Sequence, residues 1–454
     1  MSQFVITRRI VVAGGVFAPG HLGELTRIIP FEMVDAVLAE CGAAQRRLRK
    51  LPARVVVYLL LAAALFEAAG YPAVWRKLTS ALDGTAVKVT AAALWQARTR
   101  LGPAPLRALF DLLRGPAAAP RTSGSWWRGL LVCAIDGTTL DVPDTPGHQA
   151  RLGKGSNQYT AASGYPQIRL VALVACGTRA IIDAVFGPTA DAETAYLPRL
   201  LRSLHCGMIV LLDRGLSSNA LLAATASTRA DFLARLSASR KPPVLRRLPD
   251  GSFVSVLGTA RVRVIECQIT IITTAGAQTG TYRLATTLLD HHRYPAFELV
   301  KLYHQRWEIE SAYFEIKKTM LGRRVLRART LPGITQEIYA LLTVYQAIRI
   351  AITDTTLTAP GTDPDRASFT IALQAAREQV VQAAGVIAGE TIDLAGAIGR
   401  HILGNLLPAR RLRVSPRAVK RPLSRYAYKS LRVDRRTYKA TISIDILMTN
   451  PPSP

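Results

Sequence analysis

The stretch YHQRWEIESAYFEIKK, residues 303–318, places acidic, basic and apolar side chains within about four and a half helical turns. At about 100° per residue, Glu310 falls about 40° from Arg306, so both belong to one stripe of the predicted helix. The stripe is polar and consists of Tyr303, Arg306, Glu310, Tyr313 and Lys317. Apolar residues flank it on both sides, which predicts that the stripe faces the protein body. These flanking residues are Trp307 and Phe314 on one side and Ile309 and Ile316 on the other.

The other two acids of this stretch, Glu308 and Glu315, fall about 180° to 200° from Arg306. They are therefore expected on the far face, where replacement by Gln is tolerated. Glu310 is the acid that the pattern selects for chemistry. An ordinary ion pair between Arg306 and Glu310, four residues apart on a helix, accounts for the same spacing equally well.

Two aspartates share a context that suits a metal site. Asp136 ends the apolar run "LLVCAI" and Asp213 ends "MIVLL", and a glycine-containing turn is predicted after each. Acids at the ends of buried strands are held rigidly at one edge of a sheet. Asp183 lies inside an apolar run, and Asp141 and Asp144 lie in a proline-rich turn that favours local hydrogen bonding. A purely structural role for each aspartate remains an alternative.

A ligand set made only of carboxylate oxygens favours Mg²⁺ or Mn²⁺. Two such ions held by carboxylates activate a water or a 3′-hydroxyl and stabilise the leaving oxygen in phosphodiester chemistry. Two strand-end aspartates and one helix-borne glutamate therefore predict a metal-dependent site. The sequence offers no competing ligand set, because the five cysteines are scattered and form no CxxC pair.

The charge of the chain indicates a polyanionic partner. The 454 residues include 58 Lys and Arg against 31 Asp and Glu, a net charge of +27. Nucleic acid is the leading candidate, and a ribosomal or membrane-surface role is the alternative. Residues 410–439 carry twelve Lys or Arg and one Asp, with tyrosines interleaved. This tail is predicted either to contact nucleic acid or to be merely solvated.

No membrane partner and a reducing cytoplasm are expected. The longest apolar run, residues 55–66, is too short to span a bilayer and predicts a buried helix. The first ten residues lack the apolar core of a signal peptide.

The pattern along the chain predicts an α/β protein. Helical spacing dominates residues 1–125, which include the basic stretch "QRRLRKLPAR" at 45–54 and end in a linker-like stretch at 115–125. Short strands and helices alternate over 126–230, and extended runs fill 231–290. Helices return over 291–350, and 351–454 holds a further helical region and the basic tail.

Together these motifs resemble the insertion-sequence-four type of DDE transposases. Tyr303, Arg306, Glu310 and Lys317 match the family's Y-x2-R-x3-E-x6-K signature without a gap. "AIDGTTLDVPD" resembles the first aspartate motif and "LLDRGLSS" the second, although Leu216 replaces the usual aromatic residue. The similarity extends to "LTRIIPFEMVDAVL" and "GYPQIRLVALV", and so covers nearly the whole chain.

The resemblance implies a ribonuclease H-like mixed sheet with flanking helices over 126–230 and 291–350. It also implies a β-rich insertion at 231–290 and an α-helical DNA-binding domain at 1–125. Asp136, Asp213 and Glu310 are then the catalytic metal ligands, holding two Mg²⁺ or Mn²⁺ ions.

By the same resemblance, Arg306 and Lys317 contact the DNA backbone and Tyr303 binds a terminal phosphate. The expected activity is the cutting and joining of DNA strands at terminal inverted repeats, by a homodimer bound to double-stranded DNA. The expected location is the bacterial cytoplasm, on the nucleoid when DNA is bound.

Two alternatives belong to other classes. A phosphatase of the haloacid dehalogenase type needs a second aspartate two residues after the first, and Thr138 stands there. A catalytically inactive, transposase-derived DNA-binding protein explains the charge and stays open.

Overall fold

The chain forms two units, which the computed structural model describes over residues 21–44, 51–80, 88–154, 164–274, 276–382, 396–408, 413–414 and 438–447. Unit 1 comprises Met1–Met208 and Arg306–Leu407, and unit 2 comprises Ile209–Gln305 and Pro408–Pro454. Most of the basic tail at 410–439, and the first six residues of the basic stretch at 45–54, lie outside the described residues.

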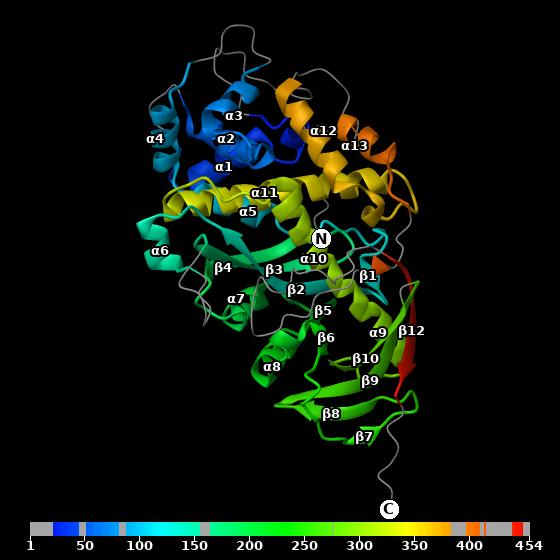
Figure 1. The fold of residues 1–454 in the computed structure, drawn as a ribbon. Coiled ribbons are helices and arrows are strands. Elements are labelled where there is room, and N and C mark those ends of the chain that lie inside the picture. Colours follow the sequence, from blue (N-terminus) through cyan, green and yellow to red (C-terminus); the bar gives the residue numbers. More distant parts are fainter. Residues whose placement is uncertain are drawn as a thin grey trace, which may run out of the picture. The chain divides into compact units, whose positions relative to one another are not determined.

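Unit 1 begins with helices, as the sequence predicts (Figure 1). They are α1 (Phe31–Glu40), α2 (Ala53–Leu65), α3 (Tyr71–Leu78), α4 (Ala91–Leu101) and α5 (Ala104–Leu113). α2 carries apolar residues on every side, and twelve of its thirteen residues are buried. The prediction of a buried helix at 55–66 is therefore confirmed, and a helix of this kind needs neighbours on all its faces.

The later helices of unit 1 pack against these. They are α11 (Leu331–Leu357), α12 (Phe369–Gln382) and α13 (Gly396–Leu403). α11 contacts α2, α4 and α5, and 19 of its 27 residues are buried. No helix of the described residues is long and apolar enough to cross a membrane.

The strands of unit 1 form an antiparallel sheet. β2 (Leu130–Asp141) pairs with β3 (Gln167–Ala175), β3 pairs with β4 (Ile181–Pro188), and the short β1 (Trp126–Trp127) pairs with β2. Residues 115–125, the predicted linker, have no helix or strand and are bonded to the body, for example by the Gly115 amide to the Ile181 carbonyl at 2.9 Å. α6 (Pro146–Leu152) follows β2, and the short α7 (Leu197–Leu200) follows β4.

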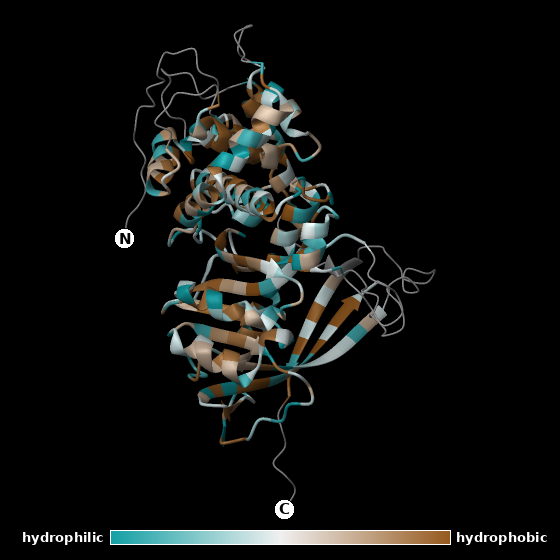
Figure 2. Cartoon of the chain, turned by 90° about the vertical axis from the view of Figure 1, so that its left-hand side faces the viewer, coloured by the Kyte–Doolittle hydropathy of each residue, from teal (hydrophilic) through white to brown (hydrophobic). Residues whose placement is uncertain are grey.

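The strands of unit 2 pair in both parallel and antiparallel fashion. β5 (Met208–Leu212) runs parallel to β6 (Asp231–Arg235), and the other pairs are antiparallel, in the order β11–β12–β9–β10–β6–β5. The remaining bounds are β7 (Arg246–Arg247), β8 (Phe253–Leu257), β9 (Ala260–Thr273), β10 (Gly276–Thr286), β11 (Arg413–Val414), β12 (Tyr438–Ile446), α8 (Asn219–Ser227) and α9 (Ala296–Tyr303). Hydrophobic and polar residues alternate along several strands of the chain (Figure 2), as in sheets with one covered face.

The expected fold class, a mixed α/β protein with a helical N-terminal part, is confirmed. The strand β12 was not predicted: it lies in the region assigned to helices and a basic tail, and it pairs with β9 from Ala440 opposite Thr273 to Ile446 opposite Cys267. The domain boundaries stay a prediction.

Candidate active site

The central strand of the site, β2, does not end at Asp136 as its sequence pattern predicts. It continues to Asp141, and residues Gly137 to Asp141 pair with Val171 to Gln167 of β3. Gly137 is therefore an extended residue and not part of a turn. A Cβ atom at this position would lie 2.7 Å from the Glu193 side chain, so the glycine makes room for that carboxylate.

Asp136 and Glu310 lie on either side of one cation in unit 1. Arg306, only 8% exposed, places Nη1 3.6 Å from the Asp136 carboxylate and Nη2 3.5 Å from that of Glu310. The predicted ion pair between Arg306 and Glu310 is thus present, and Arg306 also contacts the aspartate of β2. A plain helix-surface ion pair does not account for this arrangement, because Arg306 is buried.

Burial raises the pKa of Asp136 to about 6. The hydrogen bond from the Gly137 amide at 2.9 Å and the Arg306 charge lower this pKa, whereas the neighbouring acids Glu193 and Glu310 raise it. Burial is thus the main cause of the raised pKa, and the Arg306 charge does not bring the pKa back to its usual range. Carboxylate oxygens are donors that suit a divalent metal ion.

Tyr313 ties the helix of Glu310 to the strand of Asp136. Its hydroxyl donates to the Asp136 carbonyl at 2.6 Å and accepts from the Ala172 amide at 3.1 Å. Asp136 and Ala172 are partners in the β2–β3 register, so Tyr313 is bonded into the sheet at that step. Lys317, half-buried, donates to the Thr138 hydroxyl at 3.1 Å, and burial lowers the pKa of this lysine.

Asp213 belongs to unit 2 and directly follows β5, as predicted. Tyr303, also in unit 2, donates its hydroxyl to the carbonyl of Leu212 at 3.1 Å, next to this aspartate. Within the described residues, no three His, Cys, Asp or Glu side chains are grouped closely enough to hold a metal ion. The joining of Asp213 to Asp136 and Glu310 therefore stays a prediction.

The burial of two faces of the Glu310 helix differs from the burial that the helical angles predict. The helix runs through α10 (Trp307–Phe314) and continues as a π-helix over Glu315–Met320. Trp307 and Phe314, which flank the stripe predicted to face the body, are 40% and 53% exposed. Glu308 and Glu315, predicted on the far face of the helix, are buried at 3% and 7% exposed. The expectation that this far face points away from the protein body was wrong.

The two buried glutamates bind one arginine. Arg179 in the β3–β4 turn donates to Glu308 at 2.8 Å, to Glu315 at 3.1 Å and also to Asp365. Glu315 further accepts from Arg349 and from the Tyr345 hydroxyl. We call Arg179, Glu308, Glu315 and Asp365 the Arg179 cluster. It holds the helix of Glu310 from the side opposite to Asp136, and the helical angles alone gave no sign of it.

Glu193 was not predicted as a site residue. It lies in a short 3₁₀ helix, Glu193–Ala195, and its carboxylate comes within 4.0 Å of Arg169. The sequence pattern showed only the start of a helical segment there. Its proximity to Asp136 depends on the pairing of β2 and β3 and on the return of the chain after β4.

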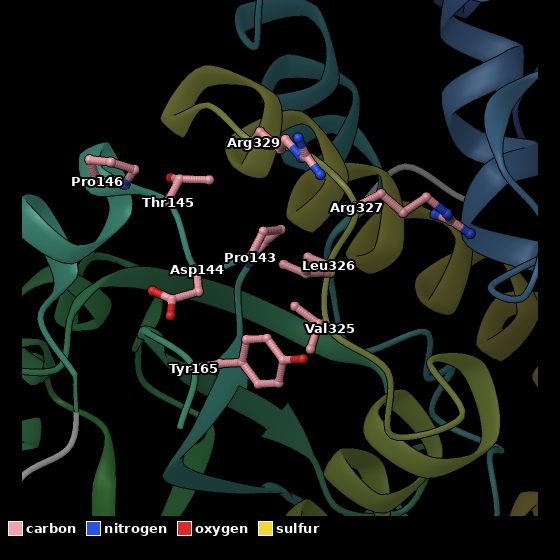
Figure 3. A pocket seen from close by; sticks show the side chains of 9 residues that line it. All are labelled: Pro143, Asp144, Thr145, Pro146, Tyr165, Val325, Leu326, Arg327 and Arg329. Carbon is pink, nitrogen blue, oxygen red and sulfur yellow. The ribbon is translucent and has the colours of Figure 1, made fainter. Parts of the chain in front are cut away.

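A cavity of about 640 Å³ lies beyond the end of β2 in unit 1 (Figure 3). Its lining residues are Pro143, Asp144, Thr145, Pro146, Tyr165, Val325, Leu326, Arg327 and Arg329. None of the predicted site residues lines this cavity. It is distinct from the arrangement around Asp136.

Comparisons with known proteins identify the family of the chain. A family model described as "Insertion element 4 transposase N-terminal" matches residues 19–111, and one described as "Transposase DDE domain" matches residues 127–347. The transposase InsG for insertion sequence element IS4 of Escherichia coli (strain K12) is 27% identical over 411 residues, which cover 86% of this chain and 90% of InsG.

Two further similarities are more limited. The putative transposase InsZ of the same organism is 30% identical over 196 residues, which cover 43% of this chain and 64% of InsZ. A cryo-EM structure of the piggyBac transposase synaptic complex with hairpin DNA aligns over 86% of this chain and 84% of that chain, with 12% identity and a TM-score of 0.39.

The DDE-domain match spans β2 to α11 and includes Asp136, Asp213 and Glu310. The chain is a DDE transposase, an enzyme that acts on DNA, and its catalytic domain is ribonuclease H-like. With the N-terminal match, it belongs to the insertion-sequence-four type of this family. Enzymes of this class depend on divalent metal ions.

Proposed function

We propose that this transposase cuts and joins DNA strands at the terminal inverted repeats of an insertion sequence, with Asp136, Asp213 and Glu310 as one catalytic metal site. The observation that carries the proposal is the pair of carboxylates, Asp136 and Glu310, on either side of the buried Arg306. The two acids are far apart in the sequence, and a shared site is the simplest reason to hold both beside one cation.

The three acids would hold Mg²⁺ or Mn²⁺, in the proposal two ions, which when bound supply an activated oxygen nucleophile and stabilise the leaving oxygen. The residues around them have their own tasks. Tyr313 fixes the Asp136 backbone, and the Arg179 cluster fixes the Glu310 helix. These contacts hold the two catalytic carboxylates in fixed positions, and in-line phosphoryl transfer requires such fixed positions.

Arg306, Lys317 and Tyr303 are proposed DNA contacts. Arg306 contacts both Asp136 and Glu310, and its guanidinium would be available for a phosphate of the cleaved strand if these acids held a metal ion instead. Lys317 lies half-buried beside Thr138, where it can reach a phosphate from within the site. Tyr303 would bind a terminal phosphate through the hydroxyl that here bonds the Leu212 carbonyl.

The proposed partner is double-stranded DNA, bound by a homodimer in the bacterial cytoplasm, on the nucleoid. Moving a DNA segment requires cutting both of its ends, and the chain has one candidate triad and no internal repeat. Two chains per element are therefore needed. Mixing a Glu310→Gln protein with a DNA-binding-defective protein that keeps its triad tests this: restored cleavage supports action in trans, and cleavage by complexes of one chain with one DNA end refutes it.

Replacing Glu310 with Gln tests the catalytic assignment. Nicking of a duplex that carries the terminal repeat, in Mg²⁺, should be abolished, whereas binding of that duplex should be nearly unchanged. Glu378→Gln, an exposed glutamate of α12, is the matched control and should nick like the wild type. If Glu310→Gln protein still nicks, Glu310 is not in the site. A wild-type protein that binds the repeat and never nicks would favour the inactive, DNA-binding alternative.

A further inference from the structure

One face of α4 in the N-terminal part of unit 1 is exposed and carries no acid. Trp95, Gln96, Thr99 and Arg100 are exposed, and Trp95 at 59% is among the most exposed large hydrophobic residues described. We call these four residues the α4 face. In Figure 1, α4 lies at the outer edge of the helices of unit 1. The face is therefore accessible to a partner.

The opposite side of α4 is firmly anchored. Leu94, Ala97, Arg98 and Leu101 are buried. The Arg98 guanidinium stacks 3.6 Å from the ring centroid of Tyr71 at the start of α3. This contact fixes the orientation of α4 relative to α3, and residues that recognise a ligand need such a rigid support.

α11 adds a second anchor at the C-terminal end of α4. The buried Gln336 side chain donates to the Arg98 carbonyl at 2.8 Å and to the Gly102 carbonyl at 2.7 Å. The Arg98 carbonyl also accepts from the Gly102 amide at 3.3 Å, so Gln336 bonds the C-terminal end of α4 at its cap. The exposed face is therefore presented by a rigid helix.

The charge of α3 and α4 indicates the class of partner. The described residues 71–80 and 88–101 include no Asp or Glu and five Lys or Arg, of which Arg98 is buried. Arg76 and Lys77 are exposed on the neighbouring α3. An acid-free surface on a chain of net charge +27 favours a polyanion over a protein partner.

We propose that α4 lies in the major groove of the terminal repeat and that the α4 face reads its base pairs, with Arg76 and Lys77 of α3 on the flanking phosphates. This inference rests on the proposed function, because it assigns the sequence-reading element of the same enzyme. A helix fits the major groove of B-form DNA, and a preceding helix that contacts the backbone is a recurrent arrangement.

The side chains suit this task. Gln pairs with adenine and Arg with guanine through two hydrogen bonds each, and apolar groups contact the thymine methyl. Gln96 and Arg100 lie four residues apart on one side of α4, about 6 Å along the helix, which corresponds to about two base steps. Trp95 and Thr99 offer apolar contact beside them. Ala91 and Ala92, exposed in the first turn, leave room for close approach of the DNA.

Selection from a library of random duplexes, without Mg²⁺, tests the proposal in the full-length protein. The wild type should enrich one motif. Gln96→Ala and Arg100→Ala should each lose preference at about one position, with the discrimination there falling by about 5- to 150-fold. Arg100→Lys should lose the same preference although it keeps the charge. Gln374→Ala on α12 and Arg121→Ala, which change exposed residues elsewhere in unit 1, should enrich the wild-type motif.

The outcomes separate the two proposals. If the wild type enriches no motif, the proposed function is contradicted along with this inference. If the wild type enriches a motif and all α4 variants enrich the same one, only this inference is wrong. If Trp95→Ala changes the oligomeric state in sedimentation and leaves the motif unchanged, the α4 face is a protein interface and the inference is refuted. Thermal melting of each variant identifies any that do not fold, and Arg100→Lys then remains the deciding variant.

Discussion

Replacing Arg179 with Met should destabilise unit 1 strongly. The substitution removes the cation that three carboxylates share, at 2.8 Å to Glu308, 3.1 Å to Glu315, and to Asp365. Arg179 has 13% of its side chain exposed and Glu308 5%, so water does not replace the missing partner. Breaking a buried ion pair by removing one partner costs about 3–5 kcal/mol.

The expected fall in melting temperature follows from the size of the unit. Unit 1 contains 310 residues (208 + 102), and an unfolding entropy of about 2.1 cal/mol/K per residue makes 1 kcal/mol equal to about 1.5 °C. A loss of about 3–5 kcal/mol therefore lowers the melting temperature by roughly 5–8 °C. Arg179 has a φ of 56°, and Met at this position has the same backbone strain. The change in melting temperature therefore measures the loss of the ion pairs and not a change in backbone strain.

Differential scanning calorimetry in about 0.1 M and about 0.5 M salt measures this effect. The shift should persist at high salt, because buried pairs are screened little. Glu378→Gln, on the exposed side of α12, should melt within about 1 °C of the wild type. A shift for Arg179→Met as small as that of the control would refute the reasoning, because it would mean that Glu308 and Glu315 tolerate the loss of their cation.

Three further predictions follow from the site and the tail. Asp136 has a pKa raised to about 6, so its contribution to stability is present near pH 4 and is lost as pH rises through 6. In the presence of a chelator, the melting temperature of Asp136→Asn relative to that of the wild type should therefore rise between pH 4 and pH 7, and a difference that stays constant would contradict this. Tyr313→Phe loses the bonds at 2.6 Å and 3.1 Å and should cost about 1–3 kcal/mol in unfolding free energy, with slower nicking but unchanged repeat binding; full nicking activity would show that the Asp136 backbone needs no such support. Changing the eight Lys and Arg between residues 415 and 437 to Gln should flatten the salt dependence of DNA binding, by about 0.9 in slope for each phosphate that is no longer neutralised, and an unchanged slope would mean that the tail is only solvated.

The tail prediction uses substitutions and not truncation for a structural reason. Deleting the chain after Leu407 would remove β12, which pairs with β9 over seven residues from Ala440 to Ile446. A truncated protein would expose β9 as a new edge. The loss of DNA binding and the loss of the strand would then be confounded.

Local patterns predicted several elements well. α2 was predicted from an apolar run that has no polar face, and β3 and β4 lie among the short strands predicted over 126–230. Asp213 follows β5 as expected, because Met208–Leu212 is short, apolar and ended by an acid and a glycine. These features depend on neighbours in the sequence.

Features that depend on distant partners were predicted less well. Gly137 reads as a turn residue, yet the pairing with β3 and the approach of Glu193 keep it in a strand. Glu308 reads as a solvent-facing acid, because the sequence does not reveal that Arg179 lies opposite. β12 alternates Ile with Thr, Ser and Asp, a strand pattern that the surrounding basic residues obscured.

The proposed metal site requires that Asp136, Asp213 and Glu310 bind divalent metal together. Mn²⁺ binding to the protein–DNA complex, followed by electron paramagnetic resonance, tests this without relying on catalysis. We predict that Asp136→Asn, Asp213→Asn and Glu310→Gln each weaken the same Mn²⁺ sites and that the double variants bind little more weakly than the single ones. Glu378→Gln should bind Mn²⁺ like the wild type. Wild-type Mn²⁺ binding by Asp213→Asn would contradict a single three-acid site, because it would leave the aspartate of unit 2 outside the metal site.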